Sequence, residues 1–212
     1  MIPIYNIPIR LEKSLIFKRM HIHSELPNYA EFDKAYDELI DEIKLLAESK
    51  GIYVLKENTG KPKMHKGLCE VSHQVYVLVT LGEKISDRST RYFKEKDFLK
   101  GLMIDAMADQ ILFNISDDFY KIIRKDIFET RGYALTVRYS PDDHFIPIEN
   151  QKVILDEVHG KELLGIDVTE GFMYRPLKTM GYVYGADKNI TIAEKDHDCR
   201  LCSNEKCEFR TV

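Results

Sequence analysis

The end of the chain concentrates the residues best suited to hold a metal. Three of the four cysteines follow one another as Cys199-x2-Cys202-x4-Cys207. A Cys-x2-Cys turn lets two thiolates point at one ion, and the third cysteine can supply another ligand. Zinc and an iron–sulfur cluster both suit such a thiolate set, so the spacing leaves both open, beside unmetallated thiols. The fourth ligand could be His197, Asp196, Cys69 or an exogenous group.

Two carboxylates lie four residues apart in a strongly apolar stretch. Asp105 and Asp109 fall on the same face of the helix predicted there, so they are neighbours. Two like charges in that position repel each other, and we therefore expect a positive group opposite them. This group could be an Arg or Lys from elsewhere in the fold, or the cationic part of a ligand.

Arg138 is the second candidate for ligand binding. It ends a predicted strand just before the turn "SPDDHFIP". A guanidinium there could hold a carboxylate through two hydrogen bonds, or it could pair with Asp142 or Asp143 and brace the turn. A third candidate pair, His21 and His23, lies in a predicted strand, where both rings would face one side and could chelate a metal or simply meet solvent.

The elements that position these residues alternate irregularly between helix and strand. The sequence predicts an amphipathic helix from an Asn28 N-cap to Gly51, a buried helix through Leu99 to Ile111, and a second helix restarting at Ser116 or Asp117. A shorter helix is expected at Glu149–Val158, stopped by Gly160. Strands are expected at Ile2–Leu11, Val75–Gly82, Tyr133–Ser140, Leu164–Thr169 and Thr179–Gly185. This order favours an α+β fold with a largely antiparallel sheet packed against long helices.

Length and charge limit the function classes. Of the 212 residues, we expect residues 1–186 to form one α+β domain and residues 187–212 to be a Cys-rich C-terminal appendage. A net charge of -4 gives no overall attraction to nucleic acid or to an anionic membrane surface. No apolar run is long enough to span a membrane and the N-terminus lacks the pattern of a signal peptide, so we expect a cytoplasmic protein.

Five segments, read in order, suggest a family. They are "VTLGEKIS", "KDFLKGLMIDAMADQ", "VRYSPDDHFIPIENQKVILD", "GIDVTEGFMYRPLKTMGYVYG" and "CRLCSNEKCEFR". Together they resemble the reactivation (activation) domain of cobalamin-dependent methionine synthase, and more closely its stand-alone branch, which ends in a Cys-x2-Cys-x4-Cys signature. The resemblance extends from about residue 75 to the end of the chain.

The resemblance implies a function and a set of partners. Domains of this family bind S-adenosylmethionine and support the reductive remethylation of a cobalamin that a partner methyltransferase holds. One electron from a donor protein and one methyl group restore methylcobalamin. By the same resemblance, the C-terminal cysteines could carry an iron–sulfur cluster as an electron relay, with a zinc site that holds the tail in place as the rival.

The family's ligand signature, Arg-x-x-x-Gly-Tyr, is only partly present. Arg138 is kept, where it would receive the methionine carboxylate, and Tyr139 follows it. Asp142 and Asp143 stand where the family has Gly and Tyr. The segment Met173-x-x-Pro176-x-Lys178 matches the stand-alone branch and is expected to form a turn into a strand that lines the same cleft.

Two hypotheses follow. In the first, the chain helps to reactivate a corrinoid methyltransferase: Arg138 binds a carboxylate, Asp105 or Asp109 lies near an amino or sulfonium group, and the cysteines form a metal centre. In the second, the chain is a non-catalytic module that docks to a corrinoid protein or carries a metal and has lost S-adenosylmethionine. The aspartates at positions 142 and 143 favour the second hypothesis.

Overall fold

A five-stranded antiparallel sheet forms the centre of the molecule. The computed structural model describes residues 3–60, 66–141, 146–191 and 196–197. The strand order is β1-β2-β3-β7-β4, and a separate pair, β5-β6, lies beside it. The strands are Ile4–Tyr5 (β1), Lys50–Glu57 (β2), His73–Thr80 (β3), Ala134–Leu135 (β4), Asp167–Val168 (β5), Tyr174–Arg175 (β6) and Thr179–Asp187 (β7).

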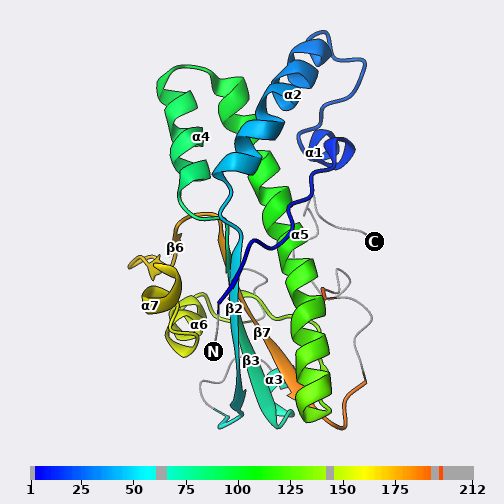
Figure 1. Ribbon diagram of the computed structural model, residues 1–212, viewed down its shortest axis with the longest axis vertical. Coiled ribbons are helices and arrows are strands. Elements are labelled where there is room, and N and C mark those ends of the chain that lie inside the picture. Colours follow the sequence, from blue (N-terminus) through cyan, green and yellow to red (C-terminus); the bar gives the residue numbers. More distant parts are fainter. Residues whose placement is uncertain (1–2, 61–65, 142–145, 192–195, 198–212) are drawn as a thin grey trace.

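Helices cover both faces of this sheet. The longest, α5, runs along most of the molecule on one face, while α6 and α7 lie on the other (Figure 1). Near the N-terminal half of α5, α2 and α4 pack against it. The helices are Lys13–Arg19 (α1), Tyr29–Leu46 (α2), Lys66–Cys69 (α3), Lys84–Lys94 (α4), Phe98–Arg131 (α5), Asn150–Glu157 (α6) and Gly160–Leu164 (α7).

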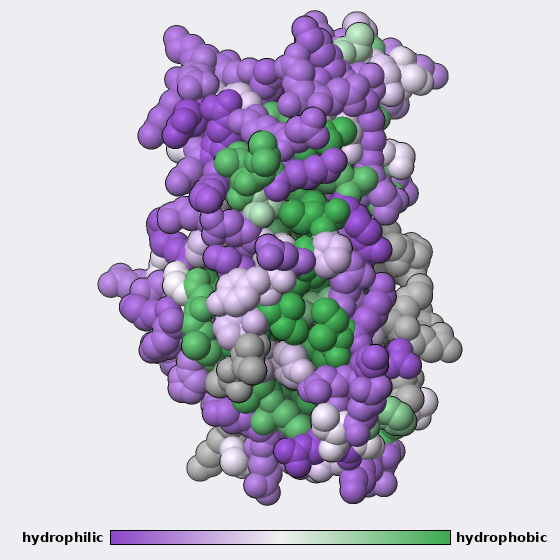
Figure 2. Space-filling model, in the orientation of Figure 1, coloured by the Kyte–Doolittle hydropathy of each residue, from purple (hydrophilic) through white to green (hydrophobic). Residues whose placement is uncertain are grey.

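The pleat of β7 divides the interior into two cores. Tyr182 and Tyr184 point toward α5 and join the larger core, whereas Val183 between them joins the smaller core under α6 and α7. This alternation is the period-2 pattern of a strand that is buried on both faces. On the face drawn in Figure 2, hydrophobic side chains gather along the middle of the molecule between polar flanks.

The predicted α+β class and antiparallel sheet are confirmed, and the predicted break within the long helix is wrong. Ser116 does not cap a new helix, because α5 continues without interruption from Phe98 to Arg131. Gly51 does not end the preceding helix either. It lies in β2, where an added Cβ would come 2.9 Å from Cζ of Phe119, so glycine serves close packing there.

Several predicted strands are shorter than expected or absent. The segment Tyr133–Ser140 contributes only β4 and one bridge to Val183. Within Ile2–Leu11 the strand is limited to β1. His21 and His23 lie in a turn after α1, with His21 at φ +54° and Ile22 buried between them, so the predicted strand with both rings on one side is wrong.

Two further details of the last third differ from the prediction. Gly160 opens α7 rather than only ending the helix before it, and the strand expected from Leu164 shrinks to β5. The strand predicted at Thr179–Gly185 is confirmed as β7. Among the described residues, no helix is both long enough and apolar enough to cross a bilayer.

Candidate functional site

The charged residues singled out in the sequence meet along one line, between α5 and β7. We call this line the α5–β7 seam. It has two polar clusters, one around Lys178 at the start of β7 and one around Arg138 beside its centre. The seam comprises Asp105, Asp109, Ser116, Arg138, Lys178, Tyr184 and Asp196.

The first cluster joins both helix carboxylates to one lysine. Nζ of Lys178 lies 2.8 Å from Oδ1 of Asp105 and 2.6 Å from Oδ1 of Asp109. The lysine is buried, whereas the carboxylate side chains remain 47% and 44% exposed. The predicted positive group opposite the aspartates is therefore present, and it comes from the protein itself. Burial alone would lower the pKa of Lys178, but the two carboxylates outweigh it and raise that pKa.

The backbone holds Lys178 at this place. Its carbonyl accepts hydrogen bonds from the amide of Leu81 at 2.9 Å and from Oγ1 of Thr80 at 3.3 Å. A cis peptide bond joins Arg175 to Pro176 shortly before it. Residues 176–178 form a bend that leads directly from β6 into β7, as the sequence predicts for this segment, and the ammonium group of Lys178 lies over α5.

The second cluster surrounds the guanidinium of Arg138. Nη1 donates to Oγ of Ser116 at 2.9 Å and to Oδ2 of Asp196 at 3.0 Å, and it lies 3.7 Å from the sulfur of Met180. Tyr184 donates its hydroxyl to the other oxygen of Asp196. The Arg138 and Asp196 side chains are only 7% and 6% exposed, so this ion pair is removed from water.

Aromatic rings complete the surroundings of Arg138. Its guanidinium carbon lies 5.7 Å from the ring centroid of Phe113 and 5.6 Å from that of Tyr182, within the range of cation–π attraction. Burial, followed by the charge of Asp196, raises the pKa of Tyr182 and of Tyr184. Both hydroxyls therefore stay protonated at neutral pH, and that of Tyr184 remains a donor to the carboxylate.

The sequence suggested two roles for Arg138: to bind a ligand carboxylate, or to pair with a carboxylate of the turn that follows it. Its guanidinium already holds a carboxylate, that of Asp196, and the Arg138 amide also donates to the Asp196 carbonyl at 2.8 Å. The sequence suggested Asp142 or Asp143 as internal partners, and both lie outside the described residues. Tyr139 packs against the smaller core, away from the α5 face that Arg138 lines.

The contribution of Asp196 and Ser116 to this cluster was missed in the sequence. Asp196 was considered only as a metal ligand, and Ser116 only as a helix cap. They meet Arg138 across 58 and 22 residues of chain, respectively. One signal was available: Ser116 is a small polar residue in line with the apolar face of a helix, and a buried hydroxyl needs a partner.

The predicted metal ligands are mostly beyond what the structure describes. Cys199, Cys202 and Cys207 lie outside the described residues. Cys69 is a free, exposed thiol at the end of α3, and His197 is half-buried next to Asp196. Within the described ranges, no group of three or more His, Cys, Asp and Glu side chains is arranged to hold a metal ion.

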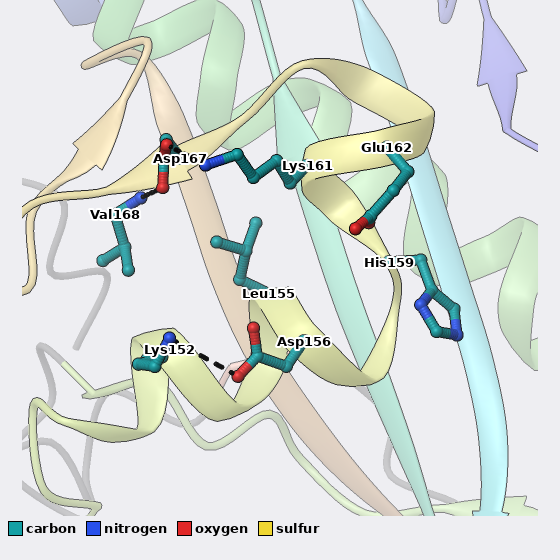
Figure 3. Close-up of a pocket in the computed structure, with 8 residues that line it drawn as sticks. All are labelled: Lys152, Leu155, Asp156, His159, Lys161, Glu162, Asp167 and Val168. Atoms are coloured by element: carbon teal, nitrogen blue, oxygen red, sulfur yellow. Dashed lines mark hydrogen bonds and ion pairs between the residues drawn. The ribbon is translucent and has the colours of Figure 1, made fainter.

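A hollow of about 320 Å³ lies apart from the seam, between α6, α7 and β5 (Figure 3). Two ion pairs border it: Lys161 with Asp167 at 2.7 Å, and Lys152 with Asp156 at 3.8 Å. Leu155 lies between these pairs in Figure 3. The hollow includes none of the predicted site residues, and the two ion pairs at its border lie in solvent, where each pair stabilises little.

Comparison with known proteins gives one informative result, at the level of structure. No protein-family model matches the sequence, and no curated protein matches it either. A crystal structure of the MetH reactivation domain bound to AdoHcy superposes with a TM-score of 0.68 at 12% identity, covering 90% of this chain and 79% of that one. The fold is that of the MetH reactivation domain. At this identity the likeness shows the fold alone, so ligand and activity are inferred below.

Proposed function

We propose that this chain is a reactivation-domain-like accessory protein that supports reductive remethylation of a cobalamin held by a partner methyltransferase, with S-adenosylmethionine as methyl donor. One electron reduces cob(II)alamin to cob(I)alamin. The reduced cobalt then takes the methyl group from the sulfonium, which leaves S-adenosylhomocysteine. The electron comes from a donor protein, and the cobalamin belongs to the corrinoid partner.

The observation that carries this proposal is the structural likeness to a reactivation domain bound to AdoHcy, which extends over 90% of the chain. The order of the sequence segments that resemble that family supports it independently. In this proposal the α5–β7 seam borders the ligand site: Arg138 receives the carboxylate, and Asp105 and Asp109 attract the amino or sulfonium group.

A ligand at this site would have to bind beside, or replace, the partners that Arg138, Asp105 and Asp109 already have in the structure. Arg138 would share its guanidinium between Asp196 and the incoming carboxylate, or exchange one for the other. Asp105 and Asp109 are nearly half exposed, so they can contact a cation while Lys178 remains bound to their inner oxygens. We also propose Asp142 and Asp143, on the resemblance alone, as residues of this ligand site, whereas Tyr139 is not included because it packs against the smaller core.

The test is a titration with S-adenosylhomocysteine, followed by calorimetry. We expect saturable binding that Arg138→Lys weakens about tenfold, since lysine keeps the charge opposite Asp196 but loses the planar fork that holds a carboxylate. Arg10→Lys is the matched control, because Arg10 is 53% exposed and pairs with Asp118. An absence of binding at millimolar ligand, with the protein shown to be folded, would reject the proposed methyl-donor site.

A second function is favoured by the pairing of Arg138 with Asp196. A guanidinium that is already neutralised inside the protein has less need of a ligand carboxylate. In this case the chain is a non-catalytic module that docks to a corrinoid protein or carries a metal. Recovery of a cobalamin-bound methyltransferase by the protein, combined with no binding of S-adenosylhomocysteine, would favour this function over the first.

The C-terminal cysteines belong to both proposals. We propose that Cys199, Cys202 and Cys207 bind an iron–sulfur cluster or zinc, with His197 or Cys69 as a possible fourth ligand, within a C-terminal appendage that begins at about residue 187. An absorption spectrum of protein purified without oxygen, with metal analysis, separates the alternatives. A band near roughly 400 nm that bleaches on reduction indicates a cluster and an electron relay, whereas a colourless protein with stoichiometric zinc indicates a structural site.

A further inference from the structure

A second hollow, of about 260 Å³, lies beside the C-terminal half of α5. Its wall is the helix, the lower part of the long green helix in Figure 1, and its floor is the buried strand β4. The residues that line it are Lys121, Arg124, Lys125, Phe128, Tyr133, Ala134 and Leu135. We call it the basic hollow. It shares no residue with the α5–β7 seam.

Three positive charges border the basic hollow, and only two carboxylates lie close to them. Lys121 pairs with Asp118 at 2.8 Å, and Lys125 lies 4.0 Å from Glu129, a marginal contact between exposed side chains. Arg124 takes part in none of the ion pairs found among the described residues, and its side chain interacts instead with the hydroxyl of Tyr120. Cations three and four residues apart on one helix face repel each other, so an anion bound between them would relieve a cost that the free protein carries.

The helix dipole does not explain this cluster. Cations favour the last turn of a helix, where the carbonyl groups are unsatisfied, and the effect falls off within that turn. In α5 this place is taken by Arg131, whereas Lys121, Arg124 and Lys125 lie between six and ten residues before it.

Aromatic rings form the other side of the basic hollow. Phe128 is 56% exposed, so its ring is accessible to a ligand in the basic hollow. The ring of Tyr133 has a defined position, because the ring of His73 packs against it at 4.8 Å and Nζ of Lys188 lies 5.9 Å from its centroid. A flat apolar group can stack here while a negative group attached to it reaches the cations.

We propose that the basic hollow binds a mononucleotide, with the phosphate on Arg124, Lys121 and Lys125 and the base against Phe128 and Tyr133. Guanidinium and ammonium groups are the usual partners of phosphate, and bases stack on aromatic side chains irrespective of their sequence. The volume of about 260 Å³ is at the small end for a ligand site, which disfavours any ligand longer than one nucleotide. A polynucleotide is disfavoured because the chain as a whole carries a net charge of -4.

The test is calorimetric titration of the full chain with AMP, adenosine and inorganic phosphate. We expect AMP to bind at least about tenfold more tightly than either fragment, because only AMP uses both halves of the hollow. Raising the salt from about 50 to about 200 mM should weaken AMP binding markedly but adenosine binding little. S-adenosylhomocysteine, which has no phosphate, should displace AMP from the basic hollow no better than adenosine does, so this result is independent of the proposed methyl-donor site.

Two variants and a control assign the binding to this place. Arg124→Gln should weaken AMP about tenfold and Phe128→Ala should weaken AMP and adenosine alike, whereas Arg91→Gln should change neither. Arg91 is likewise an exposed helical arginine, but it lies on α4. No saturable AMP binding by the folded protein, or binding that Arg124→Gln leaves unchanged, would overturn the proposal.

Discussion

The buried ion pair of Arg138 and Asp196 makes a sharp prediction for the variant Asp196→Asn. Asparagine has nearly the same shape and still accepts a hydrogen bond, but it leaves the charge of Arg138 without its counter-ion. Removal of one partner from a buried pair costs about 3–5 kcal/mol. Because both side chains are at most 7% exposed, water compensates little of this cost. We expect the lower end, about 3 kcal/mol of unfolding free energy, since one acceptor oxygen remains.

The assay is urea unfolding, supported by thermal melting. For a chain of this size about 3 kcal/mol corresponds to a decrease of roughly 6–12 °C in the melting temperature. The matched control is Asp156→Asn, because that carboxylate is 63% exposed and lies 3.8 Å from Lys152; it should change stability by about 0.5 kcal/mol or less. If Asp196→Asn lowers the free energy of unfolding by less than about 1 kcal/mol, the charge of Arg138 does not depend on Asp196 as its counter-ion.

A double substitution separates lost charge pairing from lost packing. Replacement of both partners by apolar residues, Arg138→Met with Asp196→Leu, removes the unpaired charge that either single change leaves behind. We therefore expect the double variant to be more stable than Asp196→Asn, although Ser116 and Tyr184 lose partners. A double variant as unstable as the sum of the two single variants would show that the two side chains contribute independently.

Three further predictions concern groups outside this pair. Burial raises the pKa of Tyr76 to about 12 from an ordinary 10.0. The contribution of the neutral Tyr76 hydroxyl to stability is therefore fully present below pH 10.0 and is lost as the pH rises to about 12. In Tyr76→Phe, the free energy of unfolding measured in urea should decrease less steeply over this pH range. Hydrogen bonds from the backbone amide of Asn189 and from Ser72 hold the pKa of Asp187 at about 2 instead of 3.8, so its contribution to stability is lost as the pH falls through this range; an NMR titration of its carboxyl carbon with a midpoint near 4 would contradict this. In Gly181→Ala the new Cβ would lie 2.2 Å from Oη of Tyr174, so we expect a loss of about 1–3 kcal/mol, and an unchanged melting temperature would refute the close contact.

The parts of the fold that could be predicted are those specified by local pattern. The apolar run of β3, the stripe of α2 and the alternation of β7 each indicate their element within a few residues. The single helix α5 was missed because Ser116 looks like a cap in the sequence. In the structure its hydroxyl accepts a hydrogen bond from Arg138, so it fills a polar gap in the core and does not end the helix.

For a similar reason, only half of the candidate site could be predicted from the sequence. The i, i+4 spacing of Asp105 and Asp109 is enough to require a nearby cation, and in the structure this cation is Lys178, which the sequence did not link to them. The partner of Arg138 could not be found in this way. Asp196 reaches it from another part of the chain, and no periodic pattern links the two positions.

The order of the strands has a consequence for the newly synthesised chain. The central strand β3 pairs on one side with β7, and the register joins Thr80 to Thr179. At a synthesis rate of about 5–20 residues per second, one edge of β3 stays unpaired for about 5–20 s before the first residue of β7 is synthesised. Because β3 carries a continuous apolar run over residues 75–79, this open edge is a site where nascent chains could associate with one another. Association between newly synthesised chains is therefore most favoured in the interval before β7 leaves the ribosome and pairs with β3.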